Sequence, residues 1–71
     1  MKYLIVIEKA NGNFSAYIPD VPGCGATGKT LEEVKQAIMD AAAMHFEGLI
    51  EDGIPAPEPI AQADYIAVTS F

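Results

Sequence analysis

The first eighteen residues contain two short apolar runs with different patterns. Residues 3–8 are rich in β-branched side chains and apolar at most positions, whereas residues 13–18 alternate apolar and polar side chains. Both patterns are typical of β-strands, and the alternation indicates a strand with one face toward water. The dipeptide Asn11-Gly12 between the runs favours a tight turn. The pattern therefore predicts an antiparallel hairpin.

A third strand and a long helix are predicted in the middle of the chain. A turn rich in proline follows the hairpin, and a short strand fits at about residues 24–27. Thr30 and Glu33 form a capping-box pair, so we expect the helix to begin at Leu31. We expect Gly53 to end it, because glycine readily adopts the left-handed conformation that closes helices. Apolar residues recur every three or four positions along one helical face, at Leu31, Val34, Ile38, Ala41, Ala42, His45 and Leu49.

A fourth strand is predicted near the end of the chain. Prolines at positions 55, 57 and 59 prevent the helix from resuming and predict an extended crossover. Residues 65–68 then return to the sheet as a strand. The predicted fold class is α+β with the order β-β-β-α-β. It has one mixed sheet of four strands, beginning as an antiparallel meander, and a single long helix packed on one face.

This fold leaves one face of the sheet uncovered. The first and fourth strands carry apolar residues on both faces, but one helix covers only one face. A chain of 71 residues is also marginal alone, and its single cysteine and single histidine provide neither a disulfide nor a zinc site. We therefore expect a homo-oligomer, a dimer or higher. The residues expected to self-associate are Leu4, Val6, Ile66 and Val68.

The charge balance narrows the choice of partner. Ten acidic residues against four lysines and no arginine give a net charge of −6. Direct binding of nucleic acid is not expected, because phosphate contacts require clustered basic side chains. A basic protein is the natural complement. The acidic side chains on the outer helix face, which we expect to bind it, are Glu33, Asp40 and Glu47.

One eight-residue stretch matches the phosphate-loop pattern G-x-x-x-x-G-K-[ST]. The match covers residues 23–30 and lies just before the predicted helix. However, Pro19 and Pro22 place a turn where a buried strand should lead into the loop, and no second strand ends in an acidic residue. We interpret the stretch as a connection between strand and helix, with Thr30 as the helix cap. Nucleotide binding stays the less favoured alternative.

Two other groups of residues are catalytic candidates. Cys24 and His45 are a potential thiolate–imidazolium pair, but His45 lies on the apolar helix face and no Asn or Asp is placed to orient it. Glu8, Asp20 and Asp64 are a potential metal-binding nuclease cluster, but their spacing selects no ligand set. We expect no catalytic residue, cofactor, metal or small-molecule substrate. The apolar run near the start is too short for a signal peptide or a membrane span, so a cytoplasmic protein is expected.

Several strings, taken in order, resemble the HicB-like antitoxins. The resemblance covers about residues 3–60 and includes the helix opening TLEE and the helix end LIEDGIPAP. The matching strings are YLIVIE at 3–8, FSAYIPD at 14–20, VPGC at 21–24, ATG at 26–28, TLEE at 30–33 and LIEDGIPAP at 49–57.

The resemblance implies a partial ribonuclease-H-like fold without catalytic carboxylates. It also implies a protein of a type II toxin–antitoxin system that self-associates and masks a small basic RNA-cleaving toxin of the HicA type. Many relatives carry a C-terminal DNA-binding domain, whereas this chain ends at Phe71. We therefore expect a single HicB-like domain over residues 1–71, with no separate DNA-binding domain. A solitary oligomeric relative without a toxin is the alternative.

Overall fold

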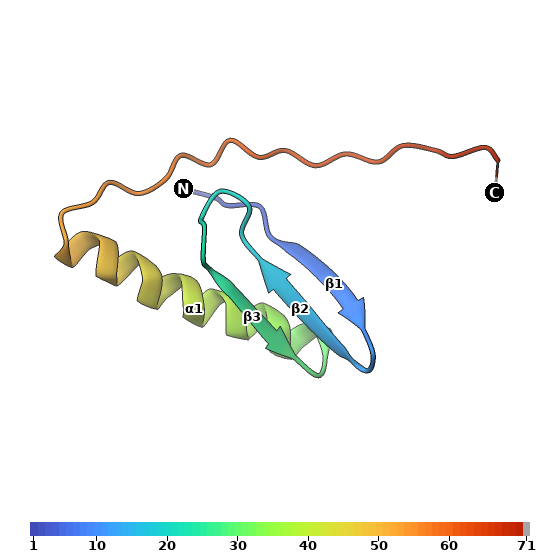
Figure 1. The fold of residues 1–71 in the computed structure, drawn as a ribbon, viewed down its shortest axis with the longest axis horizontal. Coiled ribbons are helices and arrows are strands. Elements are labelled where there is room, and N and C mark those ends of the chain that lie inside the picture. Colours follow the sequence, from blue (N-terminus) through green and yellow to red (C-terminus); the bar gives the residue numbers. More distant parts are fainter. Residues whose placement is uncertain (71) are drawn as a thin grey trace.

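The computed structural model describes residues 1–70 and contains a three-stranded sheet and one long helix (Figure 1). The strands are antiparallel in the order β1-β2-β3. The helix lies across one face of the sheet, so the fold class is α+β (Figure 1). The elements are β1 at Val6–Ala10, β2 at Asn13–Tyr17, β3 at Gly25–Gly28 and α1 at Leu31–Glu51.

The predicted hairpin is confirmed, with a shift in its first strand. Asn11 and Gly12 both have positive φ, 40° and 83°, as a two-residue turn between right-twisted strands requires. The register pairs Ala10 with Asn13 and Val6 with Tyr17. β1 therefore starts three residues later than predicted, because β2 ends at Tyr17 and leaves residues 3–5 without a strand partner.

A turn rich in proline connects β2 to β3. The Ile18 N–H donates to the Cys24 carbonyl, and the Val21 N–H donates to the Ile18 carbonyl. Gly23 has a φ of 82°, which lets the chain reverse before β3. Ile18, Val21 and Cys24 are consequently turned inward and buried.

The core lies between the helix and the last two strands. Val34 and Ile38 on α1 are fully buried, as the apolar periodicity predicts. They meet the inward residues of β2 and of the β2–β3 connection. The buried cluster is Ala16, Ile18, Val21, Cys24, Val34 and Ile38, and partly buried apolar side chains surround it. Six buried side chains make a small core, so the loss of even a few core contacts should lower the free energy of unfolding.

Both ends of α1 are capped by the predicted residues. The Glu33 N–H donates to Thr30 Oγ1 at 3.1 Å, but the Glu33 carboxylate accepts from the Lys29 N–H at 2.8 Å. In a regular capping box the Glu33 carboxylate would accept from the Thr30 N–H. Here it accepts from the N–H of the preceding residue, Lys29. At the other end Gly53 has a φ of 67°, and the Ile54 N–H donates to the Leu49 carbonyl at 2.9 Å. This closure is the Schellman motif.

The structure does not confirm the predicted fourth strand. Residues 54–70, called the arm below, run past the N-terminal segment and beyond the sheet (Figure 1). Residues 65–68 are extended without strand pairing, and Tyr65 and Ile66 are 97% and 88% exposed. The prolines keep the start of the arm extended, and the Ala61 N–H donates to Asp20 Oδ2 in the connection that follows β2. The sheet of this chain is thus antiparallel with three strands, whereas a mixed sheet of four was predicted.

The sheet and the helix approach each other closely at Gly28. A Cβ atom there would lie 2.6 Å from the Val34 backbone nitrogen. We expect Gly28→Ala to lower the free energy of unfolding by roughly 1–3 kcal/mol, because the strand and the helix must move apart. Urea unfolding followed by circular dichroism measures this change.

Gly48 provides a matched control for that experiment. It lies inside α1, and a Cβ atom there would meet nothing within 4 Å. Gly48→Ala should therefore raise stability by roughly 0.5–1 kcal/mol, as expected for alanine in a helix. Equal effects of the two substitutions would contradict the close approach at Gly28.

Candidate functional site

One face of the sheet lies opposite the helix. Ile7 pairs with Ala16, which is buried beneath α1, so the neighbouring pair Val6 and Tyr17 points to the other side. Tyr3, Ile5 and Ile7 pack against the core, and alternation places Leu4 beside Val6. Leu4 and Val6 are half-buried, and Tyr17 is 46% exposed. This open face is therefore apolar at the end where β1 begins and β2 ends, whereas the next pair on the same face, Glu8 and Ser15, is polar and exposed.

The structure does not bring together the four residues predicted to self-associate. Leu4 and Val6 lie on the open face, whereas Ile66 and Val68 lie on the arm and are exposed. The two pairs are parts of different segments that remain separate in this chain. Any contact between them requires either movement of the arm or a second chain.

The three predicted acidic residues lie along one line on α1. Glu33, Asp40 and Glu47 are all exposed and follow each other at intervals of seven residues. Seven residues are nearly two helical turns, so the line drifts by only about 20° at each step. Glu33 is held by its bond to the Lys29 N–H, and Asp40 accepts a bond from the Gln36 amide at 3.0 Å. We call these three residues the acidic stripe.

The surroundings of the stripe add charge and an apolar contact. α1 carries five carboxylates and one lysine, a net charge of −4 of the −6 of the whole chain. Met44 is 73% exposed and lies one turn from both Asp40 and Glu47. Sequence analysis missed Met44 because it falls outside the apolar periodicity. The spacing could have identified it, because Met44 follows Asp40 by four residues and precedes Glu47 by three, which places all three on one side of the helix.

The glycine-rich stretch at residues 23–30 forms a strand and a helix cap. Four of its eight positions are β3, paired antiparallel with β2 from Tyr17 opposite Gly25 to Phe14 opposite Gly28. An extended strand cannot curl its N–H groups around a phosphate. The Thr30 hydroxyl accepts the Glu33 N–H, as a cap does. The structure therefore supports the interpretation as a connection to the helix.

Cys24 and His45 occupy different parts of the molecule. Cys24 belongs to the core cluster with Ile38. His45 lies seven residues after Ile38 on α1, which is about 10 Å from Ile38 along the helix axis. The His45 ring packs edge-on against the Phe46 ring. Burial raises the pKa of the Cys24 thiol, which favours its uncharged form. This environment is that of a core cysteine.

The candidate acidic cluster is dispersed. Asp20 accepts a bond from the Ala61 N–H at 2.9 Å, and Asp64 accepts from the adjacent Tyr65 N–H. Within residues 1–70, no three His, Cys, Asp or Glu side chains lie close enough together to hold a metal ion. Over the same range, no helix is sufficiently long and apolar to cross a membrane.

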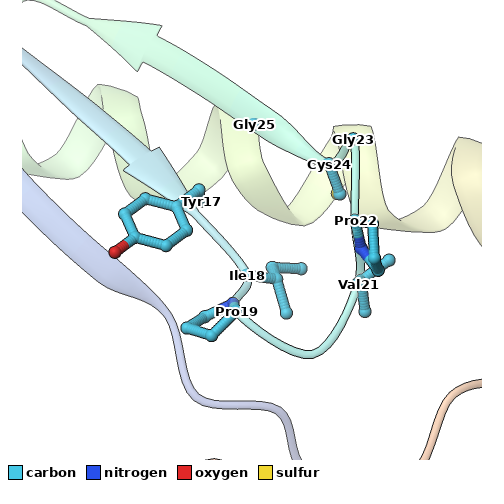
Figure 2. Close-up of a pocket in the computed structure, with 8 residues that line it drawn as sticks. All are labelled: Tyr17, Ile18, Pro19, Val21, Pro22, Gly23, Cys24 and Gly25. Atoms are coloured by element: carbon cyan, nitrogen blue, oxygen red, sulfur yellow. The ribbon is translucent and has the colours of Figure 1, made fainter.

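A shallow hollow lies at the connection between β2 and β3. Its volume is about 430 Å³, and Figure 2 shows the Tyr17 ring on one side of the connection and Pro22 on the other. None of its lining side chains is charged, whereas small-molecule sites usually include several converging polar groups. An apolar protein side chain fits this surface better than a polar substrate. The lining residues are Tyr17, Ile18, Pro19, Val21, Pro22, Gly23, Cys24 and Gly25.

Comparison with protein families gives one match over most of the chain. The family model for HicB-like antitoxins of bacterial toxin–antitoxin systems matches residues 3–71. In a solved HicA3 and HicB3 toxin–antitoxin complex, one chain matches with a TM-score of 0.71 and 35% identity. The match covers 84% of this chain and 70% of that one.

Curated relatives come from a phage, a cyanobacterium and an archaeon. An uncharacterized 14.9 kDa protein of Haemophilus phage HP1, from its rep-hol intergenic region, is 42% identical over 64 residues. The match covers 87% of this chain but only 48% of the phage protein, so the chain spans about half of its length. A UPF0150 protein of Synechocystis is 35% identical over 79% of this chain and 72% of its own length. A UPF0150 protein of Archaeoglobus fulgidus is 36% identical over 75% and 81%, respectively.

The raised pKa of Cys24 predicts a loss of stability in alkaline solution. The unfolded chain releases the thiol proton at its ordinary pKa of about 8.5, whereas the folded chain holds it to a higher pH. The free energy of unfolding should therefore fall above that pH, by up to about 1.4 kcal/mol per pH unit. Urea unfolding across this range should show a steeper fall for the natural chain than for Cys24→Ala. Identical slopes would contradict the burial of the thiol.

Proposed function

We propose that this chain, which belongs to the family of HicB-like antitoxins of bacterial toxin–antitoxin systems, acts as an antitoxin that binds and masks a small basic toxin. The observation that carries this proposal is the fold match to a chain of a HicA3 and HicB3 complex, at 35% identity. The net charge of −6 suits a basic partner. The proposed partner is an RNA-cleaving toxin of the HicA type.

The acidic stripe is the proposed toxin-binding surface. Its carboxylates recur about every 10.5 Å along the helix, since each residue advances the axis by about 1.5 Å. A surface that binds RNA presents lysine and arginine side chains to phosphates, and such side chains also bind carboxylates. An acidic helix placed on that surface would exclude RNA both sterically and by charge repulsion. The antitoxin thus needs no catalytic group.

The three members of the stripe are not equivalent. Glu33 already caps the helix through the Lys29 N–H, so its contribution to a partner is mainly its charge. Asp40 and Glu47 lie near the middle and the end of α1, with the exposed Met44 between them. Interfaces gain most of their affinity from a few buried contacts, often made by flexible apolar side chains. We propose Asp40, Met44 and Glu47 as the centre of the toxin contact.

We also propose that the chain self-associates as a dimer or a larger homo-oligomer. Support comes from the apolar open face at Leu4 and Val6 and from the exposed Ile66 and Val68 on the arm. In the assembly these residues are covered, and residues 65–68 form the predicted fourth strand. A solitary oligomer without a toxin remains the alternative function, and the toxin experiment decides between them.

The remaining parts of the proposal follow from this role. A protein that masks a toxin acts where RNA is cleaved, so we propose that it works in the cytoplasm. It uses no catalytic residue, cofactor or metal, and its acidic surface repels nucleic acid. We propose that residues 1–71 act as one binding module.

The proposed role predicts that a short basic protein is encoded beside this chain, and binding is tested with that protein. Co-expression should give a stable complex and restore growth. Glu47→Lys should weaken the complex about tenfold or more, because it places a like charge against a basic surface. Calorimetric titration of the two purified proteins measures the dissociation constant. No complex with the natural chain, together with no relief of toxicity, would contradict the antitoxin role.

Glu58→Lys is the matched control for the stripe. Glu58 is an exposed acid on the arm, and its substitution changes the net charge by the same amount. It should leave the dissociation constant within about twofold, since exposed charges far from an interface are screened by salt. Equal weakening by both substitutions would place the toxin contact outside the acidic stripe.

A further inference from the structure

We infer that the arm of one copy pairs with the free edge of β1 in a second copy, so that the fourth strand of each sheet comes from the other chain. This inference rests on the self-association proposed above and specifies its contact. It concerns residues 65–68 of the arm and residues 6–10 of the sheet. Four observations support it: the root of the arm, its exposure, the free sheet edge and the direction of the chain.

The root of the arm is held beside the start of β1. The Tyr3 hydroxyl donates a hydrogen bond to the Pro57 carbonyl. The Ala61 N–H donates to Asp20 Oδ2, in the connection that follows β2. Because Val6 pairs with Tyr17, both anchors lie at the same end of the sheet. The arm is thus fixed up to Ala61, and only the residues beyond it project.

The projecting part has the composition of a strand but the exposure of an unfolded segment. Tyr65 and Ile66 are almost completely exposed, and Val68 is 55% exposed. Aromatic and β-branched residues favour half-buried strands, and such a run is not stable in water without a partner. The exposed segment therefore indicates a surface outside this chain that covers it.

The free edge of β1 is the surface that fits a strand. In the order β1-β2-β3 both outer strands have one unpaired edge. β3 has the sequence GATG, which offers little side chain for a neighbour to pack against. β1 offers Val6 and Ile7, and a strand added to its edge would bring apolar residues beside them. An unpaired edge of this kind readily accepts a strand from another chain.

The direction of the arm favours a second copy over its own sheet. The arm continues outward beyond the sheet, and its end lies apart from β1 (Figure 1). Between Ala61 and Tyr65 the sequence is Gln-Ala-Asp, with no glycine or proline to turn the chain back. Exchange between two identical copies satisfies both arms and both edges at once, as a two-fold dimer requires.

The assembly is tested first with the isolated chain, without any toxin. We expect a dimer by sedimentation equilibrium at micromolar concentration. Ile66→Pro should raise the dimer dissociation constant at least tenfold, because proline has no N–H to donate to a neighbouring strand. Ile66 is exposed within this chain, so the helical circular dichroism of the variant should stay unchanged. Gln62→Pro is the control, since it adds a proline between the root and the strand, and it should leave the dimer intact.

Exchange in particular is tested by disulfide formation between different chains. In a Cys24→Ala background, one chain carries Ile66→Cys and another carries Glu8→Cys. Oxidation of the mixture should link the two kinds of chain. A strictly monomeric natural chain, a dimer unaffected by Ile66→Pro, or the absence of a disulfide between the two kinds of chain would overturn the inference.

The toxin experiment is read separately from these measurements. If Ile66→Pro is monomeric and still binds the toxin, strand exchange is supported and the acidic stripe acts alone. If the natural chain dimerises by exchange but binds no toxin, the inference stands and the proposed function fails.

Discussion

The structure depends on one constraint, which is that a single helix can cover only one face of a small sheet. α1 covers the inner face and buries six side chains, among them Val34 and Ile38. The opposite face, the edge of β1 and the arm keep apolar residues in contact with water. Each of these surfaces is left for another molecule to cover. A second copy is proposed for the apolar edge and a basic partner for the acidic outer side of the helix.

Local signals predicted most of the fold. Asn11-Gly12 set the hairpin, Thr30 began the helix and Gly53 ended it, because each conformation depends on neighbouring residues alone. The errors concern contacts between distant residues. β1 starts later because its partner strand ends early, and residues 65–68 are unpaired because the arm is anchored at Asp20. A propensity for strand structure specifies neither the partner strand nor the chain that supplies it.

The candidate site was predicted in part for the same reason. The exposure of Glu33, Asp40 and Glu47 follows from helical periodicity, which the sequence contains in full. The role of Glu33 as a ligand of the Lys29 N–H depends on the local path of the chain before the helix. The phosphate-loop pattern illustrates the opposite case. Its residues match, but strand pairing and close packing at Gly28 give them a structural role.

The antitoxin role predicts a short basic protein encoded beside this chain, and its most direct test is the salt dependence of binding between the two proteins. Calorimetry at low and high salt should give a complex whose dissociation constant rises steeply with salt, because the proposed contact pairs carboxylates with basic side chains. The same titration with Asp40→Asn and Glu47→Gln combined should show weaker binding and a smaller salt dependence. Absence of binding by the natural chain, or binding that salt does not affect, would contradict the account.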